Sequence, residues 1–188
     1  METMDNKVAL VTGAGSGIGR ATALLFAKKG AKVAVVDVNV AGGEETVQAI
    51  VSSGGEAVFI ECDVSDEEHV KMMVDRTVST FGRLDYAHNN AGIDGTMAPV
   101  AEQTADSFDR VIAINLRGVF LGMKYQIPAM VRQGGGAIVN TASALGLIGF
   151  SDMAPYVASK HGVNGLTKNA ASYVTGHMLV ADGGMVTQ

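Results

Sequence analysis

A run of glycines near the amino terminus constrains the fold more than any other stretch of the chain. The apolar run Val8–Val11 leads directly into the glycines, and an amphipathic segment opens after them at Arg20. This order predicts a buried strand, a tight turn and a helix. The backbone N–H groups at such a helix start face a phosphate, and glycine lets the ligand approach closely. The turn therefore predicts a dinucleotide site, although its spacing differs from the common G-x-G-x-x-G. The glycines are Gly13, Gly15, Gly17 and Gly19.

An acidic residue further along supports a dinucleotide as the ligand. Asp37 closes the next apolar segment, which begins at Lys32. It follows the glycines by roughly 20 positions, where a carboxylate that binds the adenosine ribose is expected.

The bulk composition argues against several other kinds of protein. The chain has 188 residues, 47% hydrophobic and 18% charged, enough for one domain with a substantial core. A net charge of −5 argues against non-specific binding to nucleic acid or anionic membranes. Cys62 is the only cysteine, which fits a reducing compartment, and the polar start of the chain does not resemble a signal peptide. We expect a cytoplasmic protein with a single domain over residues 1–188.

Apolar runs alternate with helical patterns along the rest of the chain, which predicts βαβ units and a doubly wound, Rossmann-like parallel α/β sheet. Ligands bind at the carboxyl ends of such strands, where Asp63, Asn89–Gly92 and Ser143 also fall. Ser65–Glu68 is expected to form a capping box at the third helix. The expected strands are 8–11, 32–36, 57–60, 84–87 and 137–140, and the later helices include 106–130 and 156–173.

A second group of residues indicates acid–base chemistry. Tyr156 and Lys160 are four residues apart and share a helix face. A tyrosine has a pKa of about 10, and an ammonium within about 4–6 Å shifts such a pKa by roughly 1–3 units, toward a usable general acid/base. Ser143 would then hold the substrate oxygen by a hydrogen bond. Alone, the Tyr-x-x-x-Lys pair fits a solvated helix face, but the strand-end serine and the dinucleotide turn favour catalysis.

These motifs occur in a defined order along nearly the whole chain. They are Thr12-Gly13-x-x-x-Gly17-x-Gly19, Asp63-Val64, Asn89-Asn90-Ala91-Gly92, Asn115, Ser143, Tyr156-x-x-x-Lys160 and a tail from Val174-Thr175-Gly176 to Asp182-Gly183-Gly184. As a set they resemble the short-chain dehydrogenase/reductase family. The resemblance implies hydride transfer between a nicotinamide and an alcohol or carbonyl carbon, with Tyr156 acting on the oxygen. It also implies that Lys160 binds the nicotinamide ribose, that Ser143 polarises the carbonyl and that Asn115 anchors a water in a proton relay. A buried amide that stabilises a helix kink near Gly118 is the other interpretation of Asn115, and the two are compatible.

The same resemblance implies a set of cofactor contacts. A 2′-phosphate would face Asp37, and like charges about 4 Å apart cost roughly 1–4 kcal/mol. Ser16 carries no charge where NADP-preferring relatives often carry a positive one, so we expect NAD. The histidines and Cys62 show no metal-ligand spacing, so no metal is expected. The expected cofactor-binding residues are Gly13, Ser16, Gly17, Ile18, Gly19, Asp37, Asp63, Val64, Asn90, Ala91, Gly92, Tyr156 and Lys160.

The family pattern breaks near residues 171/172. Family members continue there with several dozen residues, including a sixth strand and a substrate-covering segment. Here Ser172 and the lead-in to the last strand follow at once. Either a segment is missing from the sequence, or a true deletion places His177–Val180 in the sixth-strand position and leaves a poor enzyme.

Three functions therefore remain open. We favour an NAD-dependent oxidoreductase of secondary alcohols or ketones. The alternatives are a nucleotide-binding protein whose catalysis was lost by deletion, and a reductase of 3-oxoacyl thioesters or a sugar dehydrogenase on the same scaffold. Ala154, Ala158 and Gly162 form a small-residue stripe that either packs on the sheet or joins subunits. Family members commonly form tetramers, so a homo-oligomer, tetramer or dimer, is expected.

Overall fold

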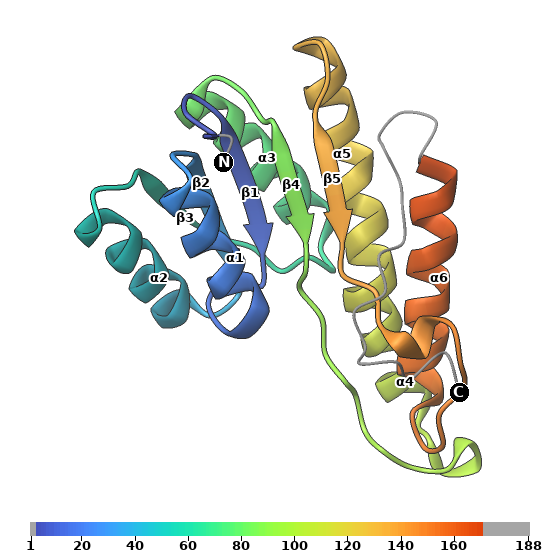
Figure 1. The fold of residues 1–188 in the computed structure, drawn as a ribbon. Helices are drawn as coiled ribbons and strands as arrows, with labels where there is room; N and C mark the ends of the chain where they lie inside the picture. The colour runs from blue at the N-terminus through green and yellow to red at the C-terminus, as the bar shows by residue number, and fades with distance from the viewer. Residues whose placement is uncertain (1–2, 171–188) are drawn as a thin grey trace.

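The computed structural model describes residues 3–170 and shows a parallel sheet between two layers of helices (Figure 1). The strand order is β3-β2-β1-β4-β5, and every neighbouring pair is parallel. This order confirms the predicted doubly wound α/β fold. The strands are β1 Val8–Thr12, β2 Lys32–Asp37, β3 Ala57–Glu61, β4 Tyr86–Asn89 and β5 Ala137–Asn140. The helices are α1 Gly17–Lys28, α2 Val40–Ser52, α3 Glu67–Phe81, α4 Ala105–Ile112, α5 Gly118–Arg132 and α6 Ala154–Ala170, with short 3-10 turns at Val100–Glu102 and Ala144–Gly146.

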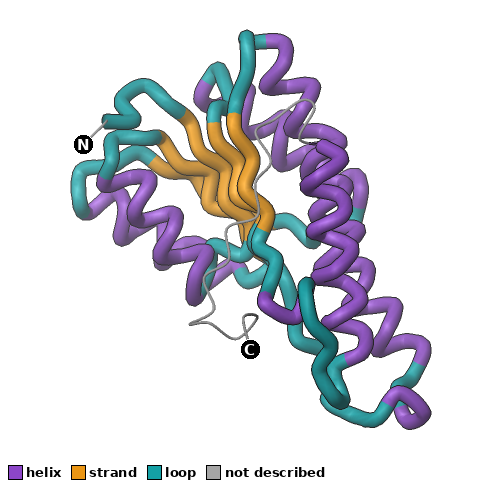
Figure 2. Tube along the Cα trace, turned by 45° about the vertical axis from the view of Figure 1, so that its right-hand side comes forward, coloured by secondary structure: helices purple, strands orange, loops and turns teal. Residues whose placement is uncertain are grey.

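Each face of the sheet has its own core. Val33 and Val35 of β2 pack against α1 and α2, together with Ala23 and Ile50. The intervening residues of the same strand pack on the opposite side, with side chains from α3, α5 and α6. Figure 2 shows the strands between the two groups of helices. Because the central strands are buried on both faces, they are continuous apolar runs in the sequence rather than alternating ones.

Two helix boundaries differ from the sequence-based expectation. The cap of α3 is Asp66, whose carboxylate accepts the N–H groups of Glu68 and His69. The expected cap, Ser65, instead donates its hydroxyl to Asp63 at 2.7 Å. The single helix expected over 106–130 is two helices, α4 and α5, joined by a π-helical turn at Ala113–Arg117.

The carboxyl-terminal tail and the question of a membrane-spanning helix complete the comparison with the sequence. The break in the family pattern near residues 171/172, and the tail that follows it, lie outside the described residues. No helix among residues 3–170 is both long and apolar enough to cross a membrane.

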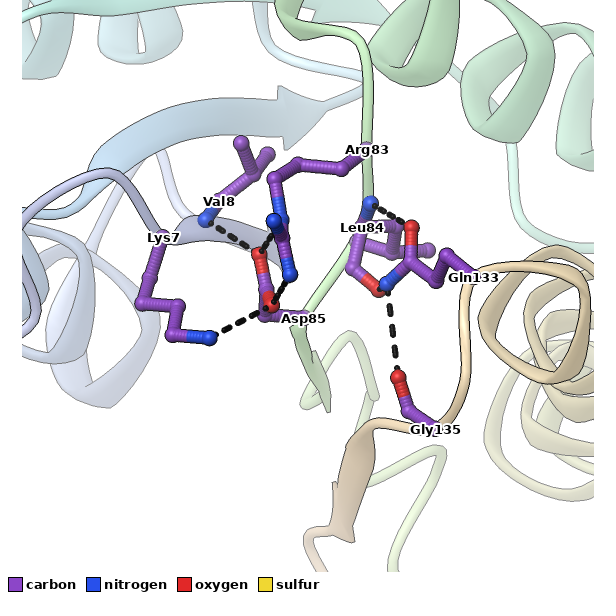
Figure 3. A network of polar contacts seen from close by, with 7 residues as sticks. All are labelled: Lys7, Val8, Arg83, Leu84, Asp85, Gln133 and Gly135. Atoms are coloured by element: carbon purple, nitrogen blue, oxygen red, sulfur yellow. Dashed lines mark hydrogen bonds and ion pairs between the residues drawn. The ribbon is translucent and has the colours of Figure 1, made fainter.

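A buried carboxylate ties the amino-terminal ends of β1 and β4 together (Figure 3). The side chain of Asp85 is 7% exposed and accepts hydrogen bonds from Val8 N–H at 3.0 Å and from both Arg83 Nε and Nη2. Lys7 Nζ lies 3.3 Å away. Burial opposes ionisation of Asp85, but the bonds from Arg83, Val8 and Lys7 outweigh it and hold the pKa of this carboxyl below its usual range. Beside it, the Gln133 amide bonds the backbone N–H and C=O of Leu84.

We predict that Asp85→Asn lowers the free energy of unfolding by about 1–3 kcal/mol at pH 7, because charge-assisted bonds to a buried group are lost. The folded-state pKa of Asp85 is depressed, so its stabilisation is present above the unfolded pKa of about 3.9 and is lost as the pH falls through the folded value. Urea unfolding at pH 7 and at lower pH should therefore show the two proteins converging. Asp75→Asn, at an exposed position of α3, is the control and should have little effect. Equal losses from both substitutions would refute a stabilising role for the hydrogen bonds of Asp85.

Candidate functional site

A groove of about 890 Å³ lies at the carboxyl ends of the strands. It extends from the glycine turn after β1, across the segments that follow β2, β3 and β4, to the start of α6. Most of the residues expected to bind a cofactor line it. They are Gly13, Ser16, Gly17, Ile18, Asp37, Asp63, Val64, Asn90, Ala91, Gly92, Tyr156 and Lys160.

Gly19 is the member of the expected set that does not line this groove. It is buried behind the turn, where a Cβ would lie 2.0 Å from the backbone oxygen of Gly13. Gly19 therefore lets the first turn of α1 pack directly on the strand exit, while Ser16, Gly17 and Ile18 present the exposed start of the helix to the groove. The N–H groups of that first turn have no partners within the helix, so they are available to an anion.

The Asp37 carboxylate fixes the shape of the turn. Its Oδ2 accepts the Gly15 N–H at 2.7 Å, and its Oδ1 accepts the Asn39 N–H at 2.8 Å. A Cβ on Gly15 would lie 2.8 Å from Oδ2, so the backbone can come this close only because residue 15 is glycine. Each carboxylate oxygen keeps a further lone pair. Because Asp37 lines the groove, these free lone pairs can accept hydrogen bonds from a ligand at the end of β2.

The basic side chains closest in sequence to the glycine turn and Asp37 are already paired with other residues. Arg20 Nε donates to Thr46 Oγ1 at 3.0 Å, and its Nη2 donates to Gly42 O and pairs with Glu45. Lys32 pairs with Glu56 at 2.9 Å. Both side chains therefore contact α2 or the segment after it rather than the carboxylate of Asp37.

Thr12 joins the two strands between which the groove opens. Its hydroxyl accepts the N–H groups of Asn90 and Ala91, at 2.9 and 3.1 Å. The Asn90 side chain returns a bond to the Thr12 carbonyl at 3.1 Å. The segment that follows β4 is thus held against the start of the glycine turn.

Tyr156 and Lys160 lie on one face of α6, as their spacing predicts, and both line the groove. Lys160 Nζ is 5.5 Å from the centre of the Tyr156 ring and donates to Thr141 O at 2.8 Å. Lys160 is only 4% exposed. Burial lowers the pKa of its ammonium to about 8, against the opposing charge of Asp94, which lines the same groove. With a pKa of about 8, Lys160 is mostly charged at pH 7 and about half deprotonated near pH 8.

Asn115 holds the π-helical turn to the loop after β4. It is 1% exposed, and its amide both accepts the Ile93 N–H and donates to the Ile93 carbonyl, at 2.8 Å each. It also donates to Ser159 Oγ at 3.2 Å, next to Lys160 in α6. A buried amide at an irregular helical turn is what the structural interpretation of Asn115 anticipates.

Ser143 lies three residues after β5 and caps a short 3-10 turn, where its Oγ accepts the Leu145 N–H at 3.2 Å. Among the described residues, neither Ser143 nor Asn115 lines the groove. The structure therefore brings Tyr156 and Lys160 to the groove but does not bring these other two expected catalytic residues to its lining.

Several residues of this site were not predicted from the sequence. Thr141, whose carbonyl holds Lys160, and Ser159, which bonds Asn115, are absent from the expected set. Arg110 and Cys62 also line the groove. The position of Thr141, directly after a strand predicted to be buried, was the available signal. Cys62 is buried, which together with the neighbouring charges of Asp63 and Asp66 raises the pKa of its thiol to about 12.

No group of three or more potential metal-ligating side chains is found among residues 3–170. His161 is exposed, and His88 is buried in β4.

A family model described as short chain dehydrogenase matches residues 7–187. The chain belongs to this family. A cyclohexanol dehydrogenase from Acinetobacter sp. (strain SE19) is 50% identical over 167 residues, which are 89% of this chain and 66% of the relative. A levodione reductase from Leifsonia aquatica is 46% identical over 168 residues, 88% of this chain and 63% of the relative. The chain thus spans about two thirds of the length of these relatives.

Solved structures agree with this assignment. The crystal structure of NAD⁺-bound xylitol dehydrogenase matches with a TM-score of 0.88 and 43% identity, over 90% of this chain and 65% of that one. The crystal structure of levodione reductase matches with a TM-score of 0.87 and 46% identity, over 89% and 66%. The short-chain dehydrogenase fold therefore extends over the described part of this chain.

We predict that Gly19→Ala and Gly17→Ala differ sharply in their effects. A methyl group at residue 19 collides with the backbone of Gly13, so the free energy of unfolding should fall by about 3 kcal/mol or more. A methyl group at residue 17 meets no atom within 4 Å, and only the positive φ of +49° is unfavourable, by about 1–2 kcal/mol. Chemical unfolding of both variants measures the difference. Equal losses would show that the close approach at Gly19 does not determine the turn.

Proposed function

We propose that this protein is an NAD-dependent oxidoreductase that interconverts a secondary alcohol and a ketone, with Tyr156 as general acid/base. The observation that carries the proposal is that one groove is lined by the glycine turn and Asp37 at one end and by Tyr156 and the buried Lys160 at the other. A dinucleotide needs the first pair of features, and proton transfer to or from an oxygen needs the second. Because the chain spans about two thirds of its relatives, the activity of the whole protein is part of the proposal.

The residues present fit a dinucleotide. Gly17 lines the groove, and a Cβ there would enter space that is empty to 4 Å. The N–H groups that open α1 are available to a pyrophosphate, and Asp37 has spare acceptor capacity for ribose hydroxyls. Asp63, Val64 and Asn90–Gly92 line the remainder of the groove and are proposed as further contacts. When bound, the nicotinamide supplies the hydride acceptor or donor.

NAD is favoured over NADP by the charges at the ribose end. Asp37 would repel a 2′-phosphate, and Arg20 and Lys32 are committed to Glu45 and Glu56. One solved relative is described as NAD⁺-bound. Both observations support NAD as the cofactor of this chain.

Proton transfer is assigned to Tyr156, whose ring centre lies 5.5 Å from the ammonium nitrogen of Lys160. Thr141 holds that ammonium through its carbonyl, and Asn115 holds Ser159 beside it. Ser143 is proposed to bind the substrate oxygen. The relatives are named for cyclohexanol, levodione and xylitol, which supports an alcohol or ketone as the substrate.

We also propose how the whole protein is organised. We place the length missing relative to family members at the break in the family pattern near residues 171/172, because the family match continues to residue 187. A homo-oligomer is supported by an apolar groove of about 500 Å³ at the π-helical turn, α5 and α6, lined by the exposed Phe120 and the half-buried Leu116 and Leu166. A cytoplasmic location is supported by the lone, buried Cys62.

We predict that Tyr156→Phe lowers kcat by about 10²–10⁴-fold, because the proton donor and acceptor is removed. The affinity for NAD, measured by calorimetry, should change by less than about twofold, because the ring is retained. Tyr125→Phe, which removes a hydroxyl bonded to Glu67 between α3 and α5, is the matched control and should keep full turnover. Turnover of secondary alcohols that survives in Tyr156→Phe would refute the assignment. NAD binding by the unsubstituted protein without any turnover would favour the nucleotide-binding alternative.

We predict that Asp37→Asn improves binding of NADP relative to NAD by about tenfold or more, because a like-charge repulsion of roughly 1–4 kcal/mol is removed while the side-chain shape is kept. Dissociation constants of both cofactors give the ratio. Glu44→Gln changes the net charge equally from an exposed position on α2 and serves as the control. If the ratio does not change, Asp37 does not select the cofactor.

A further inference from the structure

A closed ring of hydrogen bonds lies next to the Tyr156 end of the groove. His88 Nε2 is 2.8 Å from Thr141 Oγ1, and Thr141 Oγ1 donates to Asn90 Oδ1 at 3.2 Å. Asn90 Nδ2 donates to Thr12 O at 3.1 Å, and Thr12 Oγ1 donates to the carbonyl of His88 at 3.5 Å. The ring thus joins residues at the carboxyl ends of β1, β4 and β5.

The direction of the ring fixes the protonation state of the imidazole. A threonine hydroxyl has one proton, and Thr141 uses it on Asn90, so it must accept from His88. His88 is therefore protonated at Nε2. Its Nδ1 is buried without a hydrogen-bond partner among the described residues, a position in which a proton would leave an unpaired buried donor. Burial also lowers the pKa of His88, which keeps its imidazole neutral.

The ring is connected to the reacting end of the groove through the backbone of one residue. Thr141 accepts the Lys160 ammonium on its carbonyl while its hydroxyl is held by His88. Asn90, Thr141 and Lys160 all line the groove, whereas His88 does not. His88 is 8% exposed, so it approaches Thr141 from the protein interior. An apolar side chain at residue 88 would fill the same space but would leave the Thr141 hydroxyl without its donor.

We propose that His88 is a positioning residue for the reaction: its Nε2–H orients Thr141, and Thr141 in turn holds the Lys160 ammonium beside Tyr156. This inference rests on the proposed oxidoreductase function. His88 touches neither cofactor nor substrate, and its effect is on the placement of a charge that the proton transfer needs. The proposal gives a role to a histidine that belongs neither to a metal-ligating cluster among residues 3–170 nor to the expected catalytic residues.

The test exploits the different reach of two amides. Glutamine at residue 88 carries an N–H at about the distance of the imidazole Nε2, whereas asparagine is shorter and places its amide near Nδ1. We expect His88→Asn to lower kcat by about tenfold, with less than a twofold change in KM for NAD, and His88→Gln to restore kcat to within about twofold. Thr141→Val should reproduce the loss, Thr141→Ser should not, and His88→Asn combined with Thr141→Val should add little to either single change.

The outcomes separate this inference from the proposed function. Absence of turnover in the unsubstituted full-length protein overturns the oxidoreductase. Turnover in that protein, with His88→Asn folded and unchanged in kcat, overturns only the role of His88. Equal kcat losses in His88→Asn and His88→Gln also overturn it, because they show a merely structural position. The ring has its own readout: ¹⁵N NMR of labelled histidine should show the Nε2–H tautomer for His88, and an Nδ1–H tautomer contradicts the ring whatever the turnover.

Discussion

The bond between the Thr12 hydroxyl and the backbone after β4 is the contact on which the site depends. β1 and β4 are neighbours at which the strand order reverses, with β2 on one side and β5 on the other. Their continuations diverge there, one into the glycine turn and the other toward α4, and a groove must open between them. The hydroxyl of Thr12 holds these diverging segments at hydrogen-bond distance, and a Cβ on Gly13 would lie 3.0 Å from Ala91. The groove is therefore a consequence of sheet topology, and Thr12 sets its width at the base.

The two ends of the groove differ in charge because of how their ions are paired. At the β2 end a carboxylate is held by backbone N–H groups, and the nearby cations are engaged by glutamates. At the α6 end a single ammonium is buried against a carbonyl, at a cost that lowers its pKa to about 8. A ligand that fits both ends carries hydroxyl donors at one end and tolerates a cation at the other. The neutral His88 behind Thr141 adds no second positive charge to that end.

Local sequence patterns were sufficient to predict the main residues that line the groove, but not the long-range contacts that hold them in place. The glycine turn, Asp37 and the Tyr156–Lys160 pair were predictable because strand ends and helix periodicity place each of them within a few residues of sequence. The contact between Thr141 and His88 was not, because the two residues lie 53 positions apart in the chain and meet across neighbouring strands. The contact between Asn115 and Ser159 spans 44 positions and depends on an irregular turn that no periodicity signals. The position of Ser143, at a 3-10 turn outside the groove lining, likewise depends on the loop after β5.

The π-helical turn at Ala113–Arg117 has a consequence for everything that follows it. A wide turn accommodates one more residue than a regular helix, and each residue of an α-helix turns the chain by about 100°. Shortening the turn by one residue would rotate all of α5 by that angle. Gln126, which exchanges two hydrogen bonds with Asn89 in the sheet, would then swing away from its partner. A single-residue deletion in this turn would thus break the contact between α5 and β4 at a residue about a dozen positions downstream. Both the contact of Asn115 with Ile93 and the core packing of α5 therefore depend on this one irregular turn.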